Sequence, residues 1–195
     1  MDKIINAGKE FLEERSQEKQ QEAHGGSYPA GGGFFDRDDD DDFRTAKEEA
    51  SQRAGSSGSG DLFSSIISAI GQKKSSLAEE DIDEEDAVKK HKKSYVDDDD
   101  DAADERSLGA AAAMQALKMF NQGETGSKQS KGAFLGLAMS EASKLFDDKA
   151  AKGKVSSGAS KESVIQSAGE MAMKLYLKSQ GQQQGGIMGL ASKFM

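Results

Sequence analysis

The sequence predicts an all-α protein, a small helical bundle rich in Ala, Gly and Met that follows a disordered acidic arm with Gly/Ser linkers. Residues that favour strands are scarce, since the 195-residue chain contains only four Val and two Thr. Residues that favour helices, chiefly Ala, Lys, Glu, Gln, Met and Leu, are abundant. Apolar residues also recur at helical spacing in several segments, which predicts amphipathic helices.

Residues 1–58 are expected to form an N-terminal helix followed by a flexible arm. The helix should span about 2–23, with its apolar residues confined to the first three turns. A glycine-rich hinge, an acidic run over 36–42 and a short helix over about 41–53 follow it. Polar stretches of this kind bury too little apolar surface to offset the entropy lost on ordering, so we expect the arm to be largely disordered.

Residues 59–195 are expected to form the bundle. Its first helix begins near Asp61 and has the strongest apolar stripe of the N-terminal half, made by Leu62, Phe63, Ile66, Ile67 and Ile70. Ser76 and Glu79 have the spacing of a capping box, which predicts the start of a helix that continues to Tyr95. An acidic linker over about 97–104 then precedes the remaining helices.

Four more helices are expected over about 105–121, 130–148, 160–180 and 187–194. Each contains a similar short sequence, here called a phrase, in which small residues and Met are followed by Lys and an aromatic residue. The uneven spacing of these phrases excludes a solenoid with one period, so they indicate separate helices of a bundle. Gly132, Gly136 and Ser140 are spaced four residues apart, which allows a neighbouring backbone to approach closely.

The charge distribution is asymmetric. Residues 1–106 carry 15 Lys or Arg against 29 Asp or Glu, and residues 107–195 carry 11 against 6. The two parts should therefore attract each other. Solvated charged faces explain the asymmetry most simply, and an acidic arm that covers a basic surface until an anionic partner displaces it is the alternative.

No residue pattern points to catalysis, a metal or a cofactor. The chain has no Cys, and His24 and His91 stand apart without other metal-ligand residues at a suitable spacing. Asp38, Asp40, Asp42 and Glu49 match four positions of an EF-hand loop, but position six is not Gly, so loose counterion attraction is the preferred interpretation. The acidic runs more simply complement and cap the helices that follow them. We therefore expect a non-enzymatic protein without a cofactor.

The chain also lacks the pattern of a signal peptide or of a membrane span. We expect an intracellular, cytoplasmic protein, with the nucleus as an open alternative. The basic residues are dispersed and lack interleaved aromatic residues, which does not favour nucleic-acid binding.

Methionine is concentrated in the C-terminal half, where seven of the eight Met residues lie. Met side chains adapt to varied partners, although they also fill gaps in cores built of small residues. If a face is left open to a partner, the candidate residues are Ile187, Met188, Leu190, Ala191, Phe194, Met195, Met114, Met139 and Met171. The short helix over 187–194 is too short to be stable alone, so it must pack on something.

Three segments resemble the fungal proteins known as beta-flanking proteins. They are 107–120 (SLGAAAAMQALKMF), 137–147 (LAMSEASKLFD) and the C-terminal LASKFM over 190–195. The segments Leu62 to Ser65 and Ile82 to Tyr95 are similar too. The resemblance implies a fungal, intracellular, helical protein and supplies no active site. The two runs of five Asp depart from the neutral linkers of that family.

The function expected from these features is that of a helical interaction or scaffold protein that binds protein, itself included. A stress-protective, hydrophilin-like protein is the first alternative, since the chain is glycine-rich and lacks Cys and Trp. A peripheral binder of anionic membranes is the second.

Overall fold

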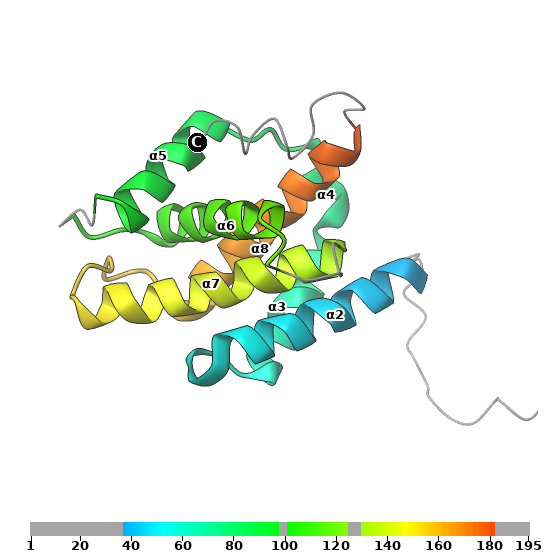
Figure 1. Cartoon of the computed structure of the whole chain (residues 1–195), viewed down its shortest axis with the longest axis horizontal. Helices are drawn as coiled ribbons and strands as arrows, with labels where there is room; N and C mark the ends of the chain where they lie inside the picture. The colour runs from blue at the N-terminus through cyan, green and yellow to red at the C-terminus, as the bar shows by residue number, and fades with distance from the viewer. Residues whose placement is uncertain (1–36, 98–100, 125–129, 182–195) are drawn as a thin grey trace, which may run out of the picture. The chain divides into compact units, whose positions relative to one another are not determined.

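The computed structural model describes residues 37–97, 101–124 and 130–181, and this part of the chain is all-α (Figure 1). The described residues form seven α-helices, one short 3-10 helix and no strand. The helices are α2 (Arg37–Ala54), α3 (Gly60–Gln72), α4 (Lys74–Glu79), α5 (Glu84–Tyr95), α6 (Glu105–Asn121), α7 (Lys131–Ala151) and α8 (Lys161–Gly181), and the 3-10 helix η1 spans Gly55–Ser57.

Side-chain caps fix where several helices begin. Ser59, Asp83, Asp104 and Ser130 each accept a hydrogen bond from a backbone N–H in the first turn of α3, α5, α6 and α7. Such a cap satisfies one of the N–H groups that a helix start leaves without a partner. Helices α3, α6 and α7 begin close to the residues that the sequence predicts.

One predicted helix start is wrong. Ser76 and Glu79 lie inside α4 rather than at the beginning of the following helix. The chain leaves helical geometry at Glu80, and α5 begins only after the Asp83 cap. Ile82, in the connection between the two helices, is buried in the core.

Helices α6, α7 and α8 pack against one another at the centre, while α3 and α4 pack on α8 and α5 packs on α6. The four consecutive alanines of α6 are buried almost completely, from Ala110 to Ala113. Small side chains let these helices approach closely. A Cβ on Gly109 would lie 2.6 Å from the Cβ of Ser167, so only glycine fits where α6 meets α8.

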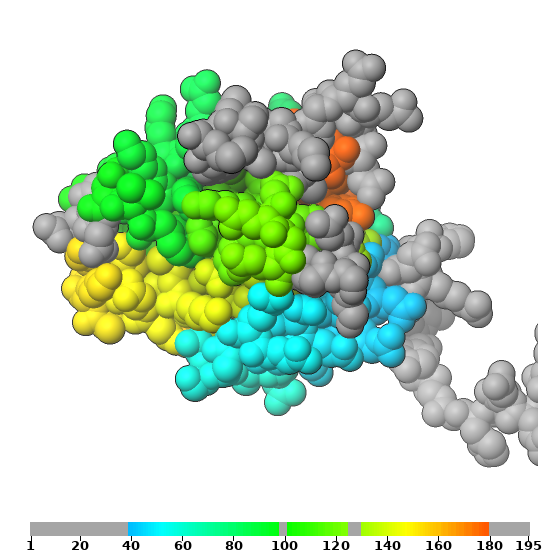
Figure 2. All heavy atoms as spheres, viewed as in Figure 1, coloured from blue at the N-terminus to red at the C-terminus, as the bar shows by residue number. Residues whose placement is uncertain are grey.

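Helix α2 lies along α7 in both views (Figures 1 and 2). Its buried apolar side chains are small, namely Ala46, Ala50 and Ala54. The facing surface of α7 is also made of small residues, and a Cβ on Gly136 would lie 2.6 Å from the Ala46 carbonyl oxygen. The close approach predicted from the spacing of Gly132, Gly136 and Ser140 is therefore present, and α2 is the element that makes it.

The expected boundary between the arm, 1–58, and the bundle, 59–195, needs correction. Residues from Arg37 onward belong to the same compact unit as the central helices, because α2 packs along the length of α7. Helix α2 has so few large apolar residues that its sequence predicts a solvent-exposed segment. Its alanines are nevertheless sufficient to pack it against the glycine and serine residues of α7.

Several expectations concern residues outside the described ranges. They are the helix over 2–23, the glycine-rich hinge, the disorder of the arm before residue 37, the middle of the acidic linker and the short helix over 187–194. Among the helices that the structure describes, none combines the length and the apolar character needed to cross a membrane.

Candidate functional site

A cavity lined mainly by lysine, serine and aspartate lies at one end of the bundle. We call it the lysine pocket. It has a volume of about 250 Å³. Its basic and hydroxyl side chains are Lys90, Lys93, Ser94, Ser107, Lys149 and Ser156. They come from α5, α6, α7 and the α7–α8 loop, so segments distant in sequence converge on it.

Backbone hydrogen bonds hold the two loops that shape this pocket. The Ala103 N–H donates to the Lys154 carbonyl oxygen at 3.0 Å, and the Ser156 N–H donates to the Ala103 carbonyl oxygen at 3.0 Å. The Ser156 hydroxyl also donates to the Ala102 carbonyl oxygen at 3.2 Å. The α5–α6 linker is therefore fixed to the α7–α8 loop, and both lie at the same end of the bundle in Figure 1.

The basic and acidic residues of the lysine pocket differ in their exposure to solvent. Lys149 is only 3% exposed, which is unusual for lysine, whereas the carboxylates of Asp101 and Asp104 belong to exposed residues. Asp104 is already used as the cap of α6, where its Oδ1 accepts from the Ser107 N–H at 2.7 Å. Hydrogen bonds from the side chain and backbone of Ser107 lower the pKa of Asp104 and keep it ionised.

A second, more open depression of about 400 Å³ lies between the end of α5 and α7. Its lining includes Tyr95, Glu141 and Asp148. The Tyr95 hydroxyl is buried and has no hydrogen-bond partner. Burial raises the pKa of Tyr95 well above its usual value, and the nearby Glu141 and Asp148 carboxylates add to the shift. Tyr95 is therefore neutral near neutral pH.

A cluster of charged residues, which we call the Asp39 cluster, joins α2 to the start of α7. The Lys131 ammonium contacts the carboxylates of Asp39 and Asp42, the latter at 3.0 Å. Lys74 pairs with the other oxygen of Asp39 at 2.5 Å. Asp42 also accepts a hydrogen bond from the Gly132 N–H at 3.1 Å, and Lys131 lies 5.9 Å from the centre of the Phe43 ring.

The pKa shifts in the Asp39 cluster show that pairing outweighs burial. Burial alone would raise the pKa of Asp39, but the hydrogen bonds from Lys131 and Lys74 leave it below its usual value. Burial alone would lower the pKa of Lys131, but the hydrogen bonds to Asp39 and Asp42 leave it above its usual value. Both groups are therefore charged across the neutral range, and the cluster is an ion-pair network.

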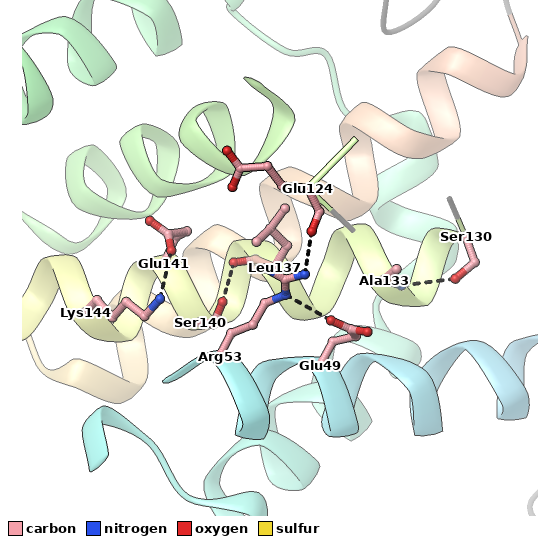
Figure 3. A network of polar contacts seen from close by, with 9 residues as sticks. All are labelled: Glu49, Arg53, Glu124, Ser130, Ala133, Leu137, Ser140, Glu141 and Lys144. Carbon is pink, nitrogen blue, oxygen red and sulfur yellow. Dashed lines mark hydrogen bonds and ion pairs between the residues drawn. The ribbon is translucent and has the colours of Figure 1, made fainter. Parts of the chain in front are cut away.

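Further polar contacts lie within α2 and α7, and one of them joins α2 to the turn after α6 (Figure 3). Arg53 donates to the Glu49 carboxylate at 2.9 Å and to the Glu124 carbonyl oxygen at 2.9 Å. The Ser140 hydroxyl donates back to the Leu137 carbonyl oxygen within α7 at 2.8 Å. The Ser143 hydroxyl donates to the Ser57 carbonyl oxygen in η1. Ser143 thus joins α7 to η1, whereas Ser140 bonds within its own helix.

His91 is buried between α5 and α6. Its Nε2 lies 2.8 Å from the Gln115 side-chain oxygen, and its ring stacks on Tyr95 with the centroids 5.1 Å apart. Burial lowers the pKa of His91, and the positive charge of Lys118 adds to this shift. A neutral, hydrogen-bonded and stacked imidazole is typical of a packing residue. His24 lies outside the described residues.

The structure describes three of the nine predicted interaction residues, Met114, Met139 and Met171. Met114 and Met139 are completely buried in the core, so they fill space between the small residues of α6, α7 and α8 and offer no face to a partner. Met171 is half-buried and packs against the core. Ile187, Met188, Leu190, Ala191, Phe194 and Met195 lie outside the described residues.

The EF-hand geometry is not formed. Asp38, Asp40 and Asp42 all lie within the continuous helix α2, whereas an EF-hand needs these positions in a loop. Among the described residues, no three His, Cys, Asp or Glu side chains are grouped so that they could hold a metal ion.

The lysine pocket was not predicted from the sequence, although a partial signal exists. Residues 89–93 (KKHKK) form a basic run in α5 that places Lys90 and Lys93 three residues apart. Lys149 and Ser156 come from a distant segment, and no periodicity connects them with that run. What the assembled groups can do is bind an oxyanion, since ammonium and hydroxyl groups are donors to phosphate and carboxylate oxygens.

Comparisons with known proteins give one similarity. Over residues 42–125 the chain matches the family described as Domain of unknown function (DUF7721). The match begins inside α2 and continues past the end of α6, so it includes the helix that the sequence places in the arm. No curated protein and no solved structure matches the chain. The chain is therefore a helical protein similar to an uncharacterised domain family.

Proposed function

We propose that the protein is a non-enzymatic interaction module that binds another protein, a second copy of itself included. The observation that supports this proposal most is the lysine pocket, a concave polar surface with ammonium and hydroxyl groups converging from several helices. The apolar faces of α6 and α7 are used inside the bundle. A partner would accordingly be recognised by polar and charged groups, together with the C-terminal residues 187–195.

The use of the buried polar side chains favours binding over catalysis. Asp39 and Lys131 pair with each other, His91 bonds with Gln115, and Ser143 bonds with a backbone carbonyl. A nucleophile needs a base within hydrogen-bond reach and a neighbouring space for substrate. The hydrogen bonds of these groups instead connect one helix to another.

The proposal includes membership of the fungal beta-flanking proteins and an intracellular location. The support for both is the set of phrases in 107–120, 137–147 and 190–195. The first two of these segments lie in α6 and α7, which pack at the centre of the fold. Relatives with the same bundle would need similar small residues at these packing positions.

Removal of the C-terminal residues tests the proposal. The chain ending at residue 186 and the full chain would be compared by light scattering and by capture of partners from cell extract. We expect the shortened chain to lose oligomeric mass or partners while circular dichroism shows the same cooperative melt. Identical mass and identical partners in both chains would count against an interaction role for this segment.

The same melt separates the proposal from its alternatives. A cooperative transition in buffer supports a folded interaction module. A coil in buffer that gains helix only on dehydration would support the hydrophilin-like alternative. Salt-sensitive sedimentation with anionic liposomes, without protein partners, would support peripheral membrane binding.

A further inference from the structure

We propose that the lysine pocket binds a phosphate monoester group, carried by a phosphorylated side chain of a partner protein or present as a free phosphate ion. This inference deepens the proposed function and rests on it, because it names the chemical group by which a partner would be held. The groups that carry it are Lys90, Lys93, Lys149 and the hydroxyls of Ser94, Ser107 and Ser156.

The charge of the pocket favours an anion. Three ammonium groups line it, and Lys149 is almost fully removed from solvent. A charge interacts more strongly in such a place than at the open surface, because the surrounding protein screens it less than water does. Lys90 also pairs with Asp86 of its own helix at 2.6 Å, and because an ammonium has three N–H groups it can donate to a ligand as well.

Two carboxylates at the pocket affect which anion binds most strongly. Asp101 and Asp104 reduce the net positive charge, so a ligand must gain enough from the lysines to overcome them. A phosphate monoester carries about −1.5 to −2 charges and three acceptor oxygens at neutral pH, whereas a carboxylate carries one charge. Three lysines against two aspartates leave an excess of one positive charge, so a phosphate gains more than a carboxylate does, and its additional oxygens can accept from the serine hydroxyls.

The size and the framework of the pocket agree with a phosphate group. Water occupies about 30 Å³ per molecule in the liquid, so a cavity of about 250 Å³ holds several water molecules and has room for a phosphate group. The hydrogen bonds between Ala103 and the α7–α8 loop hold the walls in place before a ligand enters. Such preorganisation reduces the ordering cost of binding.

Lys93 and Lys92 provide a matched pair of variants for the test. Both are exposed lysines on α5, but only Lys93 lines the pocket. Lys93→Ala and Lys92→Ala remove the same charge at neighbouring positions. Neither side chain is buried, so both variants should keep the fold, which far-ultraviolet circular dichroism would verify.

The experiment uses the full chain with sodium phosphate, a phosphoserine peptide and its unphosphorylated counterpart, titrated at constant ionic strength and followed by calorimetry and amide NMR shifts. We expect phosphate or the phosphopeptide to bind, with amide shifts at Ser94, Ser107 and Ser156. Lys93→Ala should weaken binding at least fivefold, whereas Lys92→Ala should change it less than twofold. Tighter binding of the phosphopeptide than of phosphate would indicate a phosphoprotein as the source, and equal binding, or binding of phosphate alone, would indicate the free ion.

Failure of both probes to bind, or equal loss in the two variants, would overturn the inference. The second result would mean general attraction to basic helix α5. Either result can be told apart from failure of the proposed function, because oligomeric mass and partner capture by the full chain are measured without added phosphate.

Discussion

The Lys131 ammonium lies between the carboxylates of Asp39 and Asp42, and the buried Asp39–Lys131 pair joins residues 92 positions apart in the sequence. The pair fixes the start of α2 to the start of α7. It brings together the acidic N-terminal part of the chain and its basic C-terminal part, as their opposite charges predict. Here the attraction stabilises the fold, because the carboxylates and the ammonium are largely shielded from water.

Asp39→Asn should lower the free energy of unfolding by about 2 to 4 kcal/mol, because it leaves Lys131 and Lys74 with a neutral neighbour in a buried site. Lys131 retains Asp42, which places the expected cost toward the lower end of that range. Urea denaturation followed by circular dichroism would measure the change.

The matched control for this variant is Asp41→Asn. Asp41 lies two residues along the same helix, but it is exposed and pairs with the exposed Arg44. Exposed pairs contribute about 0 to 1 kcal/mol. A similar cost for the two variants would contradict a special role of the Asp39 cluster.

Gly136→Ala should separate α2 from α7 and lower the free energy of unfolding by about 1 to 3 kcal/mol. The added Cβ would lie 2.6 Å from the Ala46 carbonyl oxygen, and a backbone group cannot move aside as a side-chain tip can. Gly158→Ala is the control, since a Cβ there meets no atom within 4 Å. Equal midpoints of urea denaturation for the two variants would contradict the close packing.

Met139→Ala should destabilise the fold by about 2 to 5 kcal/mol, because it removes a completely buried side chain and leaves a cavity in the core. Met171→Ala should cost less, since Met171 is only half-buried. Light scattering should give the same oligomeric mass for both variants. A loss of mass without a loss of stability in Met139→Ala would restore Met139 as an interaction residue.

His91 should make stability depend on pH near neutrality. Burial lowers its pKa in the folded state below the ordinary value of 6.5, so the unfolded chain takes up the proton first as the pH falls. The stabilising contribution of neutral His91 is therefore complete above about pH 6.5 and decreases as the pH falls below that value. The largest slope for one such group is about 1.4 kcal/mol per pH unit.

Urea denaturation between pH 7.5 and 5 would measure this slope for the native chain and for His91→Gln, which has no imidazole to titrate. Asp39 and Glu170 do not interfere in this window. Hydrogen bonds with lysine, and with Gln166 for Glu170, lower their pKa values below the ordinary 3.8 and 4.5, so their contributions are lost only at lower pH. Equal slopes in the two chains would contradict a buried neutral histidine.

The extent to which the sequence predicts this fold differs between its helices. The predicted ranges for α6, α7 and α8 agree with the structure to within a few residues, because helical periodicity, glycine-rich breaks and N-cap residues all mark the same positions. The placement of α2 was missed because alanine facing glycine leaves no apolar stripe in the sequence. Its buried side chains, Ala46, Ala50 and Ala54, look like those of any exposed helix.

The candidate site was less predictable than the fold. Lys149 precedes a turn in a lysine-rich stretch, so its sequence context predicts a surface residue. The fold instead buries it beside the α5–α6 linker. The packing of α5 and α7 on α6, together with the hydrogen bonds between Ala103 and the α7–α8 loop, brings it to the basic run of α5. Such convergence depends on three-dimensional contacts that no local pattern records.

The central claim is that α2 is an integral helix of the bundle. Hydrogen exchange of the full chain, measured by mass spectrometry on peptides covering 43–54 and 131–145, tests it most directly. We expect the α2 peptide to be protected to a similar degree as the α7 peptide, because the two helices are packed backbone against backbone. Exchange of the α2 peptide at the rate of an unfolded chain, with α7 still protected, would contradict the account.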